Sequence, residues 1–214
     1  MTVQTVNSNR RPVHFSQWQC FVIYGLMLSP FVYSILLLQN NNLPFFHLLL
    51  FFIGWLTYTF LEYIAHRFWM HDKEEKHPGK SLERHMHHHR HPAELKITVA
   101  LRNKLLAGNI ILIAIAFILN NYFTVFAGLY TGFVYYCFIH FVLHKPIAKK
   151  LFPRLQASHI HHHCKFPDRC FSTCVTWWDR LFNTGVSGKI KIPERVIQFY
   201  FGKDGHSSAK QFHT

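Results

Sequence analysis

The stretch YFTVFAGLYTGFVYYCFIHFVLH, residues 122–144, is an apolar run that ends in two histidines, His140 and His144. About 20 helical residues cross a hydrocarbon core of roughly 30 Å, so a run of this length predicts a membrane-spanning helix. Three further runs predict spans over about residues 19–39, 43–65 and 105–120, the last extended upstream by residues 97–101. We therefore expect an all-α membrane protein with four transmembrane helices.

Short polar links join these spans in pairs. QNNNLP connects the first two spans, and Asn120 and Asn121 connect the last two. Links this short join antiparallel helices, which predicts two hairpins with both termini on one side of the membrane. The 23 lysines and arginines avoid both links: two precede the first span, nine lie between Arg67 and Lys104, and twelve lie between Lys145 and Lys210. By the positive-inside rule, both termini, the 66–104 connection and the C-terminal part face the cytoplasm.

The composition fits this plan. Half of the 214 residues are hydrophobic, yet the formal net charge is +13, as expected for apolar blocks beside a basic aqueous part. The basic residues are interleaved with histidine runs and not with a recognition helix or an aromatic platform, which argues against a nucleic-acid partner. The length predicts a single domain over 1–214. We expect a retained cytosolic segment over 1–18, four spans over about 19–143 and a cytosolic cap over 144–214, in a bacterial inner membrane or the endoplasmic reticulum.

Histidines are concentrated in four spaced clusters. The spacings are H-x4-H, H-x2-H-H, H-x3-H and H-x2-H-H, and the residues are His66 and His71; His85, His88 and His89; His140 and His144; and His159, His162 and His163. Helical residues three and four apart share a face, so each triplet is expected to present three imidazoles to one point. His66 and His71 differ by about 140° around a helix. They are therefore expected to touch different metals or to straddle a helix end.

The clusters follow the cytoplasmic ends of the second and fourth spans, so all ten imidazoles can converge at one membrane rim. Ten imidazoles exceed what one ion takes, which favours two ions, and imidazole suits iron, zinc, copper and nickel alike. Carboxylate-bridged di-iron bundles need paired Glu-x-x-His motifs, and Glu74 with His77 is an unpaired instance. The pattern predicts a histidine-rich di-metal site.

Other residues are weaker candidates. Glu62 precedes His66 by one helical turn and Asp179 lies in WWDRLF, so each is a candidate acceptor for a ligating imidazole; the alternatives are an interfacial charge and a helix cap. The five cysteines show no C-x-x-C spacing, which argues against a disulfide framework. Five residues beside the motifs stay open as ligands: His77, His87, His91, His161 and Cys164.

The order of the four histidine clusters resembles the fatty acid hydroxylase/sterol desaturase superfamily of membrane di-iron oxygenases. LEYIAHRFWMH (61–71) and STCVTWWDRLFNT (172–184) are most similar to the fatty acid 2-hydroxylases, and the resemblance covers about residues 55–185. It implies a four-helix anchor with a cytosolic cap, two iron ions that zinc can replace, O2 and two external electrons. The ligands implied are His66, His71, His85, His88, His89, His140, His144, His159, His162 and His163.

The resemblance also implies a lipid acyl substrate, drawn from the membrane lipids and hydroxylated at carbon 2. The eukaryotic 2-hydroxylases commonly carry a cytochrome b5-type domain that residues 1–18 are too short to hold. A separate electron donor is therefore expected, either cytochrome b5-like or a ferredoxin with its reductase. Ser158 stands where a histidine is expected in the 2-hydroxylases, so a desaturase or a sterol or carotenoid oxidase stays open. A metal transporter fits less well, because transport sites lie near the bilayer midplane.

Overall fold

The computed structural model describes residues 15–38, 44–71, 80–94, 98–186 and 192–202. Within these ranges the chain is helical and has no β-strand. Four of the helices are long and apolar enough to cross a membrane, which confirms the four predicted spans and the all-α class. They are α1 (Gln17–Leu38), α2 (Pro44–Ile64), α4 (Val99–Leu119) and α5 (Phe123–Leu143).

The link between α4 and α5 is built from side-chain caps. The hydroxyl of Thr98 accepts the amide of Leu101 at 3.2 Å and begins α4. Asn120 ends α4 in the left-handed region, with φ at 46°, a conformation that asparagine tolerates. The side-chain oxygen of Asn121 then accepts the amide of Phe123 at 2.8 Å, so two asparagines turn the chain into an antiparallel hairpin.

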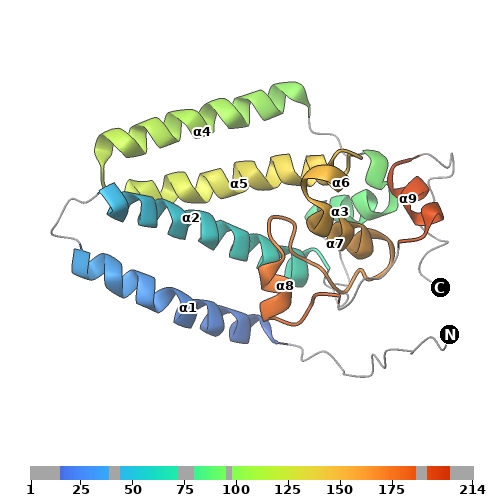
Figure 1. The fold of residues 1–214 in the computed structure, drawn as a ribbon, viewed down its shortest axis with the longest axis horizontal. Helices are drawn as coiled ribbons and strands as arrows, with labels where there is room; N and C mark the ends of the chain where they lie inside the picture. Colours follow the sequence, from blue (N-terminus) through green and yellow to red (C-terminus); the bar gives the residue numbers. More distant parts are fainter. Residues whose placement is uncertain (1–14, 39–43, 72–79, 95–97, 187–191, 203–214) are drawn as a thin grey trace.

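Helices α2 and α5 form the central pair, with α4 packed against α5 and α1 packed against α2 (Figure 1). Glycines allow this pair to approach closely. A Cβ atom added at Gly54 would lie 2.0 Å from the carbonyl oxygen of Val125, and one added at Gly128 would lie 2.0 Å from that of Phe51. The two backbones are therefore in direct contact, as is common for small residues between membrane helices.

The short helices gather at one end of the long ones, where α1 begins and α2 and α5 end (Figure 1). This arrangement gives the predicted helical cap, to which both the 66–104 connection and the C-terminal part contribute. The cap helices are η1 (Ala65–Trp69), α3 (Lys80–Arg90), η2 (Pro92–Glu94), α6 (Ala148–Leu151), α7 (Pro153–Cys164), α8 (Trp177–Leu181) and α9 (Glu194–Tyr200).

Two contacts fix the cap to the long helices. The indole of Trp178 on α8 is buried and donates to the hydroxyl of Thr59 on α2 at 3.1 Å. The side-chain amide of Gln156 on α7 donates to the carbonyls of Leu143 and Lys145 at 2.9 Å each. The ends of α2 and α5 are thus held in place beside α8 and α7.

Candidate metal centre

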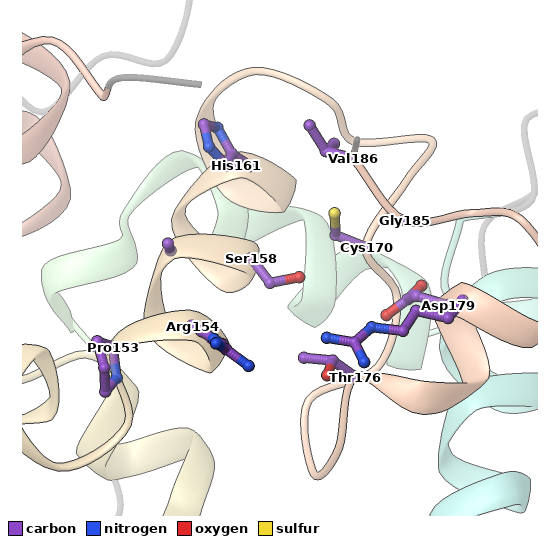
Figure 2. Close-up of a pocket in the computed structure, with 11 residues that line it drawn as sticks. Pro153, Arg154, Ser158, His161, Cys170, Thr176, Asp179, Gly185 and Val186 are labelled. Atoms are coloured by element: carbon purple, nitrogen blue, oxygen red, sulfur yellow. The ribbon is translucent and has the colours of Figure 1, made fainter. Parts of the chain in front are cut away.

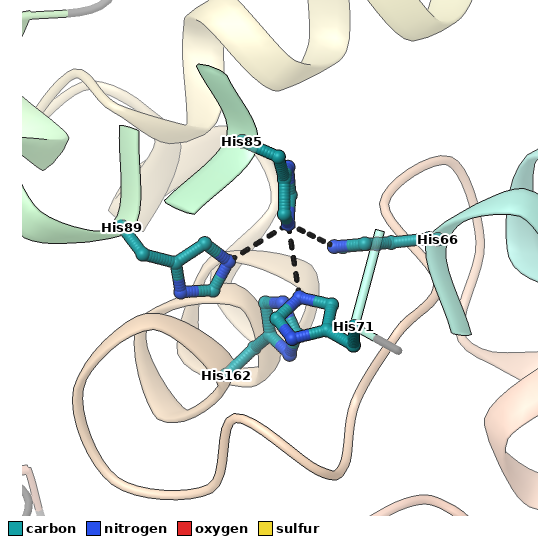
Figure 3. Close-up of side chains that lie close together, drawn as sticks. All are labelled: His66, His71, His85, His89 and His162. Carbon is teal, nitrogen blue, oxygen red and sulfur yellow. Dashed lines mark hydrogen bonds between the residues drawn. The ribbon is translucent and has the colours of Figure 1, made fainter. Parts of the chain in front are cut away.

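The ten histidines of the four clusters form two groups of five. Every histidine of a group offers one ring nitrogen, and the five nitrogens of the group all lie within 4.8 Å of one another. The first group, shown in Figure 3, consists of His66, His71, His85, His89 and His162. The second group consists of His88, His140, His144, His159 and His163.

Each H-x2-H-H triplet is divided between the two groups. On α3, His85 and His89 belong to the first group and His88 to the second. On α7, His162 belongs to the first group, and His159 and His163 belong to the second. The prediction that each triplet meets at one point is therefore wrong. Residues i and i+4 differ by about 40° around a helix, whereas residues i+3 and i+4 differ by about 100°. In a helix that lies between two sites, residues i and i+4 therefore face one site and residue i+3 faces the other.

A π-helix places His66 and His71 together. The amide of Met70 donates to the carbonyl of Ala65 at 3.0 Å, which is the i→i+5 bond of η1. His71 follows directly beyond this wider turn, and both histidines belong to the first group. The expectation of different metals is wrong for this pair, and the alternative, that they straddle a helix end, is confirmed.

His140 and His144 meet in the second group at the end of α5, as their spacing predicts. The Nε2 atom of His140 lies 3.1 Å from that of His88, and the Nε2 atom of His144 lies 3.0 Å from that of His159. The last turn of a spanning helix thus meets imidazoles from both α3 and α7.

The separations between nitrogens fit a shared ion. The Nε2 atom of His85 lies 2.9, 3.0 and 3.1 Å from the Nε2 atoms of His71, His89 and His66 (Figure 3). One imidazole nitrogen either donates or accepts, so hydrogen bonding does not account for three such neighbours. Two nitrogens that each lie about 2.1 Å from an ion are about 3.0 Å apart when the nitrogen–ion–nitrogen angle is 90°. At a tetrahedral angle they are about 3.4 Å apart. The first group therefore suits an ion with five or six ligands.

The two groups adjoin each other. The rings of His89 and His163, one from each group, stack with centroids 4.2 Å apart and an interplanar angle of 17°. Adjacent residues on α3 and on α7 also divide between the groups. The site therefore has the form of a binuclear centre and not of two remote sites.

The environment favours the neutral form of most of these imidazoles. Burial, reinforced by the neighbouring imidazoles, lowers the pKa of His88 to about 4 and those of His89 and His159 well below the ordinary value. Neutral imidazole is the form that binds metal. Among the described residues, both ring nitrogens of His163 and the Nε2 atom of His162 are buried without a hydrogen-bond partner, and a bound ion would satisfy such atoms.

A single loop orients two of the ligands. The Nδ1 atoms of His66 and His162 donate to the carbonyls of Phe171 and Arg169, which leaves each Nε2 atom to face the first group. Asp179 holds this loop, because its carboxylate accepts the amides of Phe171 at 2.9 Å and Ser172 at 3.0 Å.

Glu62 is also buried behind the first group. Its carboxylate accepts the amide of Thr173 at 3.1 Å, and one oxygen lies 3.9 Å from the Nδ1 atom of His66. The hydrogen bond of His66 goes to the Phe171 carbonyl, so Glu62 and Asp179 both act on the loop that carries this carbonyl.

Tyr200 was not singled out by the sequence. It is fully buried, stacks on His144 with centroids 4.8 Å apart, and donates from its hydroxyl to the Leu143 carbonyl at 3.2 Å. Burial raises the pKa of Tyr200 above its ordinary value. No spacing rule connects this tyrosine on α9 to the histidine clusters. The carbonyls of Arg169 and Phe171 are equally invisible in a sequence, since every residue has a carbonyl.

Residues 51–184 match the family described as fatty acid hydroxylase. The chain belongs to the fatty acid hydroxylase family. The matched segment contains all ten histidines of the two groups, together with Glu62 and Asp179. The superfamily resemblance stated from the histidine order is thereby confirmed.

Several relatives of this chain carry 2-hydroxylase names. The dihydroceramide fatty acyl 2-hydroxylase FAH2 of Arabidopsis thaliana is 27% identical, over 78% of this chain and 73% of that protein. The fatty acid 2-hydroxylase of Mus musculus is 28% identical over 63% of this chain, and the ceramide very long chain fatty acid hydroxylase scs7 of Schizosaccharomyces pombe is 29% identical over 78%. The chain spans only 39% and 48% of those two proteins.

A solved structure of scs7p, in which only the hydroxylase domain is visible, is 26% identical. The match covers 81% of this chain and 68% of that one, with a TM-score of 0.46.

Four of the five residues left open as ligands lie outside both groups: His87, His91, His161 and Cys164. His87 is on the exposed side of α3, where its ring lies 4.7 Å from that of His91. Cys164 is buried, and burial raises the pKa of its thiol to about 12. His161 lines the cavity drawn in Figure 2 and belongs to neither group. His77 falls outside the described residues.

Proposed function

We propose that this fatty acid hydroxylase is a non-haem di-iron monooxygenase that adds a hydroxyl group to a lipid acyl chain, at carbon 2. The observation that carries the proposal is the pair of adjoining groups of five imidazoles, most of which are buried. Imidazole suits iron, and the names of the relatives support an acyl substrate and carbon 2.

The reaction needs an oxidant, because replacing hydrogen by a hydroxyl group removes two electrons from the carbon, and no protein acid or base can accept them. Two iron ions held by the two groups would supply, with O2, the oxidising power that this step requires. One oxygen atom enters the C–H bond, and the other leaves as water with two electrons and two protons. The electrons come from a separate donor protein, cytochrome b5-like or a ferredoxin with its reductase.

The chain's own residues orient and enclose the ligands. The carbonyls of Phe171 and Arg169 fix the rings of His66 and His162, and Tyr200 covers the second group. The basic residues near these helix ends support a cytoplasmic position for the cap. In that orientation the electron donor approaches from the cytoplasm and the acyl chain from the bilayer.

The test is product analysis with 18O2 in membranes that contain the enzyme, iron and an electron donor. The expected product is a lipid with one labelled oxygen at carbon 2. We expect His88→Ala and His162→Ala, one from each group, to abolish the product. His87→Ala is the matched control, because His87 lies beside His88 but in neither group, and should leave the yield unchanged. A product two mass units lighter would indicate a desaturase, and an active His88→Ala variant would refute the assignment.

A further inference from the structure

Two cavities meet at Arg180, outside the two histidine groups. One, here called the polar cavity because it carries the charged side chains of Arg154, Asp179 and Arg180, has a volume of about 480 Å³ and is lined by residues of α7, of α8 and of the segments on either side of α8 (Figure 2). The other is apolar, with a volume of about 550 Å³, and lies between α1, α2 and α8. Arg180 lines both cavities. Together they offer a polar compartment joined to an apolar one.

The polar cavity is lined by residues of α7 that the metal centre does not use. Arg154, Ser158 and His161 line it at positions i, i+4 and i+7 of one helix face. Figure 2 shows Arg154 and Ser158 directed into the cavity. None of the three metal-facing histidines of α7 lines this cavity, although His162 follows Ser158 by one helical turn. The cavity therefore adjoins the binuclear centre but does not include its histidines.

The charge of the polar cavity is positive. Arg154 and Arg180 are both exposed to it. Asp179 also lines it, but its carboxylate already accepts the amides of Phe171 and Ser172 and the hydroxyl of Thr184 at 2.8 Å. Within the described part of the chain, neither arginine forms an ion pair with a carboxylate. Two guanidinium groups beside a serine hydroxyl suit a phosphate, which arginine binds through paired hydrogen bonds.

The apolar cavity lies on the candidate membrane spans. Met27 and Phe31 of α1 and Leu56 of α2 form one side, and Trp177 and Leu181 of α8 form the other. Most of these side chains remain exposed, including Met27 at 45% and Trp177 at 42%. Exposed apolar groups on a spanning helix face hydrocarbon, and tryptophans of this kind sit at the level of the headgroups.

We propose that these two cavities bind one anionic phospholipid, whose phosphate lies between Arg154 and Arg180 and whose acyl chain lies in the apolar cavity. Thr176 lines the polar cavity, Trp177 and Leu181 line the apolar cavity, and Arg180 lines both. A free phosphate would use only the polar cavity, whereas a phospholipid accounts for both. The site does not depend on the reaction at the metal centre.

Fluorescence quenching by brominated lipids tests the proposal on the full chain in nanodiscs. Trp177 is the reporter, because it lines the apolar cavity. We expect dibrominated phosphatidylglycerol to quench more than dibrominated phosphatidylcholine at equal mole fraction. Trp177→Phe should remove this excess. Arg154→Gln and Arg180→Gln should each weaken the apparent affinity for the anionic lipid about tenfold or more, since each removes a charged hydrogen-bond donor to the phosphate.

The matched control is Lys149→Gln, which removes a nearby positive charge on α6 that lines neither cavity. It should leave the excess quenching unchanged. Equal quenching by the two lipids, or an effect of Lys149→Gln as large as that of Arg154→Gln, would overturn the proposal. Displacement of the anionic lipid by inorganic phosphate at a concentration equal to that of the lipid would also overturn it, because the apolar cavity would then add nothing to the affinity. Both arginines are exposed, and an unchanged melting temperature identifies folded variants.

Discussion

Replacing Gly128 by alanine probes the contact on which the geometry of the metal centre depends. The added Cβ atom would lie 2.0 Å from the carbonyl oxygen of Phe51, so α2 and α5 must separate by about 1.4 Å to reach an ordinary contact. Overpacking of this kind costs about 1–3 kcal/mol. For a chain of this size we expect the melting temperature in detergent to fall by about 2–12 °C. Because α2 leads into His66 and α5 carries His140, the metal content per chain should fall as well.

The control for this prediction is Gly25→Ala on α1, where an added Cβ atom meets nothing within 4 Å. Alanine is the better helix former by up to about 1 kcal/mol, so this variant should melt at the wild-type temperature or slightly above it. Melting curves and elemental analysis of the purified variants provide the measurement. If Gly128→Ala matches Gly25→Ala in both readouts, the inferred backbone contact between α2 and α5 is wrong.

Three further predictions concern the surroundings of the two histidine groups. Asp179→Asn should lower the free energy of unfolding by about 1–3 kcal/mol, because the carboxylate accepts two buried amides that one amide oxygen does not fully replace; chemical denaturation measures this, and an unchanged midpoint would contradict it. Tyr200→Phe should retain bound metal, because the ring still stacks on His144, whereas Tyr200→Ala should lose it; equal metal content in the two variants would count against a covering role. Removal of metal by a chelator should lower the melting temperature, and added iron should restore it, because a ligand bound to the native state alone stabilises that state; the readout is a thermal scan before and after reloading.

Much of the architecture follows from sequence patterns that have a single physical interpretation. Apolar runs of span length predicted α1, α2, α4 and α5, and Thr98 shows why α4 begins close to the predicted extension. The convergence of ten imidazoles at one end of the bundle followed from where each cluster stood relative to a span end. These inferences needed only local periodicity and charge placement.

The division of the histidines could not be obtained in this way. Spacing shows which residues share a helix face, but α3 and α7 each lie between the two groups, and this depends on tertiary packing. The pairing of His66 with His71 depends on the π-turn of η1, which the apolar pattern does not reveal. Tyr200 and the carbonyls of Phe171 and Arg169 were missed because no sequence signal marks them.

The division of both triplets has a consequence for how the protein acquires its ions. Since α3 and α7 each contribute to both groups, the first ion to arrive immobilises two helices that the second ion also requires. By reciprocal linkage, each ion then raises the affinity for the other. Native mass spectrometry during an iron titration should therefore find chains that are empty or carry a pair, with few that carry a single ion.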